Sequence, residues 1–383
     1  MQSVRGRPHE LFRDPSEHIS IACEVLLDPQ LFDPFGQAHT IKNTRLRYEV
    51  ELVWRENGSS ARPLVARERV VRIEPANDRL KGQYIKSPVQ PRYFSHKDYL
   101  ATLSKNSKDY FVVSQDGKQG RNREIPAETA SATTLSTVRD ATFLHLFALA
   151  TEFRSWRFLQ FDPAVLRQPS DESASVDRLA PDGRNLAAVL GRMQESGNEA
   201  VLKEIADELH ELVGGIDAVV PRFVDATRQW ELWFDSARDG EISARVVSDG
   251  TIRLTALLTA VLDPEARGLI CFEEPENGVH PQRLRQLMEL LPRFSTDLRD
   301  ASEQPPLRQV VVNSHSPVVL ASVDLRSVYF ADRVARVGGG RKEAAWVTRL
   351  RRVEHALVSP DDGSVTDLEV DHYHNQARPQ SGP

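Results

Sequence analysis

Apolar and polar residues alternate along much of the first third of the chain. The alternation is regular from Ile19 to Val25 and again from Leu46 to Trp54. A period of two residues predicts strands with one buried face and one face in water, which is typical of an antiparallel sheet. The pairs Asn57-Gly58 and Asp116-Gly117 favour tight turns, because these residue types reach positive φ at low cost. We therefore predict an antiparallel sheet between His18 and Ile125.

The apolar spacing becomes helical over most of residues 126–226. An apolar residue recurs every three or four positions at Val201, Ile205, Leu209 and Leu212. The pair Gly214-Gly215 follows, which is typical of a helix end. Asp182-Gly183 predicts the start of another helix at Asn185. Alternation then returns at Trp230, Leu232 and Phe234, and Asp239-Gly240 predicts a turn after that strand.

Two apolar runs end abruptly in polar residues. Leu269–Phe272 is followed by Glu273 and Glu274, and Val310–Val312 is followed by Asn313-Ser314-His315. Fully apolar strands are typical of the middle of a parallel sheet, and ligands bind at the carboxyl ends of such strands. There one carboxylate can hold Mg²⁺, the next can orient an attacking water, and a histidine can donate to a phosphate oxygen. The alternative is that the acids begin a solvated loop and that the histidine is structural.

Ser248-Asp249-Gly250-Thr251 stands directly before an amphipathic run that reaches Leu262. A serine followed by these residues predicts a helix N-cap, which leaves backbone N–H groups free at the helix start. The same N–H groups, hydroxyls and positive dipole end suit a phosphate. Taken alone, the segment indicates a simple helix N-cap more readily than a phosphate site.

The ordered set of motifs resembles the ABC-type ATPase heads of the RecF and SMC-related group. It is most similar to bacterial AAA family ATPases, strongly over residues 246–320 and weakly over 130–246. The resemblance implies an α/β fold, a P-loop NTPase head with an antiparallel β lobe and a helical lobe. It also implies ATP and Mg²⁺ as cofactors.

Roles of individual residues follow from the same resemblance. Glu273 matches the acid that holds Mg²⁺ through water, Glu274 the catalytic base or water-orienting acid, and His315 the switch histidine. Ser248, Asp249, Gly250 and Thr251 match the signature that closes on the γ-phosphate of a partner's ATP. Glu276 and Asn277 match the loop that contacts the opposite protomer.

One part of the pattern is absent. The family begins with a strand, a Gly-x-x-x-x-Gly-Lys-Ser/Thr loop and a helix, and this chain contains no such sequence. The loop normally supplies the N–H groups and the lysine that hold the β- and γ-phosphates. The head is therefore expected to be incomplete at its N-terminus, through a truncation, a late start codon or a split gene. Unpaired edges are expected beside Leu269–Phe272 and Val310–Val312.

The expected organisation has four parts: a β-rich lobe over residues 1–125, a helical and strand lobe over 126–245, an ATPase core over 246–335, and a tail over 336–383. About 50 residues follow Ala335, too few for an appended nuclease domain. The polar end, Asn375–Pro383, is expected to be disordered.

Composition argues against several classes of partner and binding site. The 383 residues are 40% hydrophobic, and the net charge of -6 argues against a strongly basic nucleic-acid binder. The two cysteines, Cys23 and Cys271, make a disulfide framework or zinc site improbable. No apolar run approaches the roughly 18 residues of a membrane helix, so a cytoplasmic chain without membrane contact is expected.

Two functions remain open at this point. The first is an ATPase head that couples nucleotide-driven dimerisation to a partner, in DNA repair or phage defence. Its partner is expected to be a second copy or a paired ATPase chain that supplies the phosphate loop, with a DNA-linked partner possible. The alternative is a non-hydrolysing regulatory module that offers its signature face to another ATPase.

Overall fold

The computed structural model describes residues 8–12, 18–57, 60–80, 90–94, 97–115, 122–174, 177–300, 302, 306–336, 345–354 and 365–366. Within it the chain forms two compact units. The first comprises Met1–Trp156, Arg267–Leu269 and Thr296–Gln309, and the second comprises Arg157–Ala266, Ile270–Ser295 and Val310–Pro383. Both units mix helices and strands, which confirms the predicted α/β class.

The first unit is built on a six-stranded antiparallel sheet with the order β1-β4-β5-β6-β7-β8. Its strands are β1 (His18–Leu26), β4 (Arg45–Asn57), β5 (Ser60–Arg72), β6 (Leu100–Lys105), β7 (Lys108–Ser114) and β8 (Asn122–Pro126). The predicted antiparallel sheet is thus confirmed. Gly58, Asp116 and Gly117 of the predicted turns lie outside the described residues, although Asn57 pairs with Ser60 across the first of them.

Short elements complete the first unit. They are η1 (Pro8–Leu11), β2 (Gln30–Phe32), β3 (Ala38–Thr40), α1 (Thr134–Thr137), η2 (Ala141–Phe143) and α2 (Leu144–Ser155). Residues of α2, among them the buried Leu146 and Leu149, pack with apolar side chains of β4 to β7 in one core. Glu68 of β5 is fully buried and ties α1 to the sheet, because its carboxylate accepts the amides of Thr134 and Leu135 at 2.6 and 3.0 Å.

The helices of the second unit include the three for which the sequence predicts a start or an end. They are α3 (Pro163–Leu166), α4 (Leu186–Glu195), α5 (Glu199–Val213), α6 (Asp249–Leu262), α7 (Pro281–Leu290), η3 (Leu291–Phe294), α8 (Pro317–Ser322) and η4 (Leu325–Ser327). Asn185 is the N-cap of α4 and Gly214 the C-cap of α5. Ser248 caps α6 by accepting the amide of Thr251 at 3.1 Å. Apolar faces of α4 to α7 share one core.

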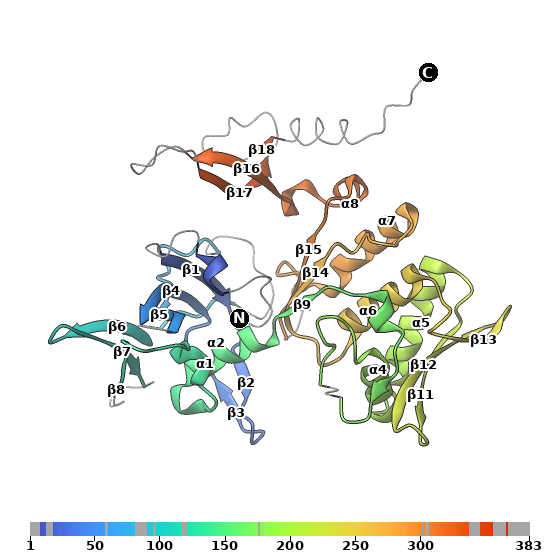
Figure 1. Ribbon diagram of the computed structural model, residues 1–383, viewed down its shortest axis with the longest axis horizontal. Helices are drawn as coiled ribbons and strands as arrows, with labels where there is room; N and C mark the ends of the chain where they lie inside the picture. The colour runs from blue at the N-terminus through green and yellow to red at the C-terminus, as the bar shows by residue number, and fades with distance from the viewer. Residues whose placement is uncertain are drawn as a thin grey trace. The chain divides into compact units, whose positions relative to one another are not determined.

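An antiparallel group of strands packs against α4 and α5 (Figure 1). It contains β10 (Ser170–Asp171), β11 (Ala218–Val224), β12 (Gln229–Ser236) and β13 (Gly240–Ser243). The predicted turn at Asp239-Gly240 is confirmed, since Gly240 has φ of 71° and β12 pairs with β13 there.

The site lies on a three-stranded sheet with the order β15-β14-β9, formed by β9 (Arg157–Leu159), β14 (Gly268–Glu273) and β15 (Arg308–Asn313). Strand β9 runs parallel to β14. The amide of Gly268 donates to Leu307 and that of Glu274 to Asn313, an equal advance along both segments, so β14 and β15 are parallel too. All three strands therefore present their carboxyl ends at one edge.

The two faces of this sheet differ in exposure. Ile270 and Phe272 are 2% exposed and belong to the core that the helices share. On the other face, Phe158 pairs with Cys271, and Phe158 remains 64% exposed. The open edge expected beside Leu269–Phe272 is wrong, because β14 has a neighbour on each side. Strand β15 pairs only with β14 among the described residues, and its Val311 is 44% exposed.

The last described elements are β16 (Tyr329–Arg336), β17 (Ala345–Glu354) and β18 (Val365–Thr366). Strands β16 and β17 pair antiparallel over eight residue pairs, so part of the expected tail is structured. Asn375–Pro383, which the sequence predicts to be disordered, lies outside the described residues.

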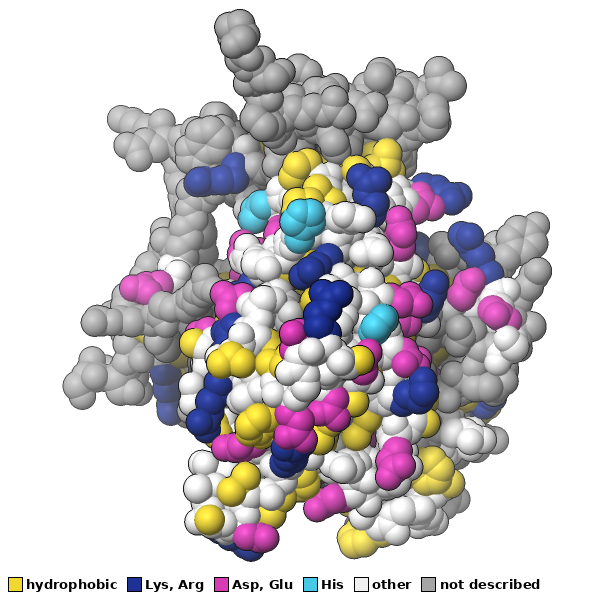
Figure 2. Space-filling model, turned by 90° about the vertical axis from the view of Figure 1, so that its right-hand side faces the viewer, with side chains coloured by type: hydrophobic (Ala, Val, Ile, Leu, Met, Phe, Trp, Pro, Cys, Tyr) yellow, Lys and Arg dark blue, Asp and Glu magenta, His cyan; other side chains and the backbone are white. Residues whose placement is uncertain are grey.

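The described part of the chain has no membrane-spanning helix, and the face that Figure 2 draws has no region of one charge. No helix in the described ranges is long and apolar enough to span a bilayer. On the face that Figure 2 draws, acidic and basic side chains are interspersed with apolar ones. This mixture agrees with the modest net charge of -6.

Candidate functional site

Glu274 occupies an unusual backbone conformation at the end of β14. Its φ is 49°, in the left-handed region that a residue with a branched or long side chain enters only at a cost of about 1 kcal/mol. The amide of Glu274 donates to the carbonyl of Asn313 at 2.9 Å, and its carbonyl accepts the amide of Asn277 at 3.1 Å. The left-handed residue thus turns the chain sharply away from the sheet edge. Strained residues of this kind are concentrated at functional sites.

His315 and Glu274 lie together at this edge, as the sequence predicts. The Nε2 atom of His315 is 3.8 Å from Oε1 of Glu274, and the histidine side chain is 78% exposed. Glu276 fixes the loop that carries the histidine, because its Oε1 accepts the hydroxyl of Ser314 at 2.8 Å and the amide of His315 at 2.9 Å. The two loops after β14 and β15 are therefore joined by hydrogen bonds, with the acid and the imidazole facing one another.

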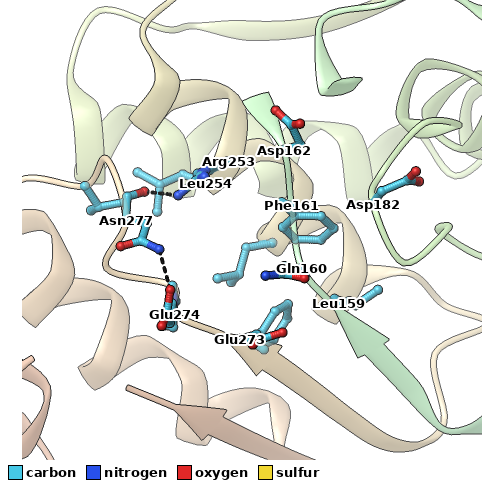
Figure 3. A pocket seen from close by; sticks show the side chains of 14 residues that line it. Leu159, Gln160, Phe161, Asp162, Asp182, Arg253, Leu254, Glu273, Glu274 and Asn277 are labelled. Carbon is cyan, nitrogen blue, oxygen red and sulfur yellow. Dashed lines mark hydrogen bonds between the residues drawn. The ribbon is translucent and has the colours of Figure 1, made fainter. Parts of the chain in front are cut away.

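A cavity of about 410 Å³ opens beside the acids (Figure 3). Glu273 and Glu274 line one side, and Arg253 and Leu254 of α6 line another. Glu273 is exposed at the last position of β14. The cavity is thus bounded by the carboxyl edge of the sheet and by the helix that follows the Ser248 segment.

The sequence interpretation missed Gln160. This exposed residue follows β9 directly and lines the same cavity, so it is the carboxyl-end residue of the third parallel strand. Strand β9 has only three residues, too few for a recognisable alternation. The one available signal was Asp162-Pro163 just downstream, where Asp162 caps α3 through the amide of Ala164.

The Ser248 segment presents an exposed helix start. Ser248 and Asp249 are exposed, whereas Thr251 is only 4% exposed and its hydroxyl is 2.8 Å from that of Ser248. Arg167 holds the segment from one side, donating to the carbonyl of Val247 at 2.8 Å and to Asp249 at 2.6 Å. The guanidinium offsets the negative charge of Asp249, which would otherwise repel an anion from this helix N-terminus.

Gly250 is required by its surroundings. A Cβ atom at this position would lie 2.8 Å from the carbonyl oxygen of Gly278, closer than side chains approach backbone. The first turn of α6 therefore rests directly on the turn that follows Glu274.

The residues present suit Mg²⁺ held mainly by water and phosphate. No group of three or more His, Cys, Asp or Glu side chains in the described part of the chain is arranged to hold a metal ion. Magnesium usually keeps several waters and takes one or two protein oxygens together with substrate phosphates. The exposed carboxylate of Glu273 and the neighbouring amide of Gln160 fit that limited role.

A family model matches residues 127–321, and its description reads "AAA domain, putative AbiEii toxin, Type IV TA system". The chain belongs to this family. The matched range contains β9, the Ser248 segment, Glu273, Glu274 and His315, so it includes every part of the site described above. The resemblance of the sequence motifs to an ABC/AAA-type ATPase core is thereby confirmed.

A search of curated proteins found no match. Among solved structures, an Smc head with coiled coil from Pyrococcus yayanosii is 16% identical, with a TM-score of 0.29, and the match covers 41% of this chain and 27% of that one. The SMC head domain from Thermotoga maritima is 10% identical at a TM-score of 0.28, covering 74% and 93% of the two chains. A Pyrococcus furiosus Smc head bound to the C-terminal domain of ScpA is 10% identical at a TM-score of 0.33, covering 83% and 79%. Scores this low do not establish a shared fold, and the family assignment rests on the sequence match.

Proposed function

We propose that this AAA-domain protein hydrolyses ATP as one part of an ABC-type head, with a phosphate loop supplied by another polypeptide segment. The observation that carries the proposal is the pairing of Glu274 and His315, 3.8 Å apart at the carboxyl ends of adjacent parallel strands. Open α/β sheets bind their ligands at this place.

The chain's own groups divide the chemistry between them. Glu274 orients the attacking water and accepts its proton, since one carboxylate oxygen faces the histidine while the other is hydrogen-bonded to Asn277. His315 donates to a phosphate oxygen. Glu273 and Gln160 would hold Mg²⁺, which would supply positive charge against the phosphates.

The sheet supports an added strand and helix. The edge of β15 has no second partner among the described residues, and Phe158 and Val311 leave apolar surface on one face. Parallel sheets normally carry helices on both faces. A strand–phosphate loop–helix unit placed at this edge would bring its loop to the edge that carries Glu274 and His315.

The proposal is tested by supplying that unit. A synthetic strand–Gly-x-x-x-x-Gly-Lys-Thr–helix segment, fused to the chain or added to it, should produce Mg²⁺-dependent ATP hydrolysis that the chain without it lacks. Glu274→Gln should remove the hydrolysis. The matched control is Glu289→Gln on α7, an exposed acid that does not line the cavity. Persistent absence of turnover in the complemented chain, with ATP bound, would overturn the proposal.

A second function is favoured by the exposure of the Ser248 segment at the start of α6. Ser248 and Asp249 are exposed on a fully formed, capped helix held by Arg167. Such a face is able to complete the ATP site of a partner without hydrolysis by its own chain. Stimulation of a paired ATPase by the Glu274→Gln variant, together with loss of stimulation in Ser248→Ala, would favour this module over the first proposal.

We place the activity in phage defence or DNA repair, with a second copy or a paired ATPase as the partner. The family description names a toxin of a type IV system, which favours defence. With a net charge of -6, contact with DNA is expected to come through a linked partner. Induced expression in bacteria tests the idea: growth arrest or reduced phage plating that disappears in Glu274→Gln supports it, and equal growth and plating contradict it.

A further inference from the structure

One turn connects the acid of the site to the helix that begins with the Ser248 segment. The side-chain amide of Asn277 donates to Oε2 of Glu274 at 2.8 Å (Figure 3). The backbone carbonyl of the same asparagine accepts a hydrogen bond from Nη1 of Arg253, on the second turn of α6. Asn277 is thus bonded to the carboxylate on one side and to the helix on the other.

Three further observations describe this turn and its approach to α6. The carbonyl oxygen of Gly278 lies where a Cβ of Gly250 would be 2.8 Å away. The Nε of Arg253 is buried without a hydrogen-bond partner in the described part of the chain, whereas its Nη1 donates to the carbonyl of Asn277. Glu274 itself is held in the left-handed region, with φ of 49°.

We infer that Arg253 and Asn277 are positioning residues through which α6 sets the carboxylate of Glu274. The inference rests on the proposed function, in which Glu274 orients water and the Ser248 segment meets a phosphate of a second nucleotide. Asn277 engages one carboxylate oxygen and leaves the other toward His315, the orientation that the reaction needs. A displacement of α6 moves Arg253, then the turn, then the acid. The two ATP sites of a paired assembly are thereby coupled within a single chain.

Hydrogen exchange on the full chain, without nucleotide, tests the mechanical link. The amides of Asn277 and Val279 are the reporters, because they donate to Glu274 and Glu276 within the turn at 3.1 and 3.0 Å. Arg253→Met keeps the apolar stem but removes the donor, and should raise exchange at both amides at least about tenfold. Arg253→Lys, which retains a donor, should restore most of the protection.

The matched control is Arg283→Met. Arg283 on α7 also donates to a backbone carbonyl, that of Val213 at 3.3 Å, which lies outside the turn. It should leave the two reporter amides unchanged within about twofold. Equal exchange in Arg253→Met and the unaltered chain would overturn the link.

Kinetics of the complemented enzyme test the effect on the acid. Asn277→Ala removes the side-chain bond to Glu274 but keeps the carbonyl that Arg253 contacts, so the turn should stay protected while kcat falls about tenfold or more with KM unchanged. A fall in affinity alone would contradict the positioning role. If the unaltered complemented chain shows no turnover at all, the proposed function fails, and the exchange experiment still decides the link by itself.

Discussion

Replacing Gly250 with alanine sets two opposite effects against each other. Gly250 has no positive φ and lies in the first turn of α6, so alanine would by itself stabilise the helix by up to about 1 kcal/mol. The added Cβ would meet the carbonyl oxygen of Gly278 at 2.8 Å, whereas ordinary contacts begin at 3.4 Å. The helix or the turn must therefore move by about half an ångström, and forced overpacking of this kind costs about 1–3 kcal/mol.

We expect the clash to dominate, because the atom approached is backbone and the turn is held by Asn313, Asn277 and Arg253. Hydrogen exchange at the reporter amides Asn277 and Val279 should rise about tenfold, which corresponds to about 1.4 kcal/mol. Gly278→Ala is the contrast: its Cβ would make only ordinary contact at 3.5 Å with Asp249, so its cost comes from the φ of 76° alone. In Gly278→Ala the amides of the first turn of α6 should stay protected from hydrogen exchange. Slower exchange in Gly250→Ala than in the unaltered chain would refute the close approach of α6 to the turn.

The remaining predictions concern the first unit and nucleotide binding. Glu68→Ala should lower the free energy of unfolding of the first unit by about 2–4 kcal/mol in urea denaturation, since two buried amides of α1 lose their acceptor; an unchanged midpoint would contradict the capping role. Burial by itself raises the pKa of Asp78. Hydrogen bonds from Arg45, the amide of Leu80 and Tyr93 lower the pKa by more, so it falls to about 2, against 3.8 for an ordinary aspartate. Because this pKa is depressed, ionised Asp78 stabilises the fold above pH 3.8, and that contribution is lost as the pH falls toward 2. Asp78→Asn should therefore weaken the fall in the free energy of unfolding over this acidic range. The same fall in the variant and the unaltered chain would count against the ion pair with Arg45. Calorimetric titration of the chain alone with Mg·ATP should show no tight binding, because the groups present contact only the γ-phosphate end and the metal; a stoichiometric tight isotherm would show that the chain binds ATP by other means.

Local sequence patterns predicted much of the site. The features that these patterns did not predict depend on contacts between segments distant in sequence. The cap at Ser248, the helix starting after Asn185 and the acids after β14 all follow from short-range periodicity and from residue types with strong positional preferences. The meeting of Glu274 and His315 could be predicted because parallel strands share a carboxyl edge.

Other features depend on tertiary structure. Strand β9 is too short to show alternation, so Gln160 was overlooked. Strand β17 forms where the sequence shows little periodicity, because β16 provides its hydrogen-bond partner. The approach of Gly250 to Gly278 joins segments distant in sequence, and no local pattern indicates that a glycine is needed for packing there. The left-handed conformation of Glu274 has no sequence signal, since glycine or asparagine is the usual residue at such a position.

We propose that Glu274 and His315 form the hydrolytic edge of an ATPase head. The most direct test of this proposal is steady-state hydrolysis of Mg·ATP by the chain complemented with the strand–phosphate loop–helix segment, measured for the unaltered protein and for Glu274→Gln. We expect turnover by the unaltered protein and a loss of at least about a hundredfold in kcat for Glu274→Gln, with ATP still bound. Equal rates in the two proteins would contradict it.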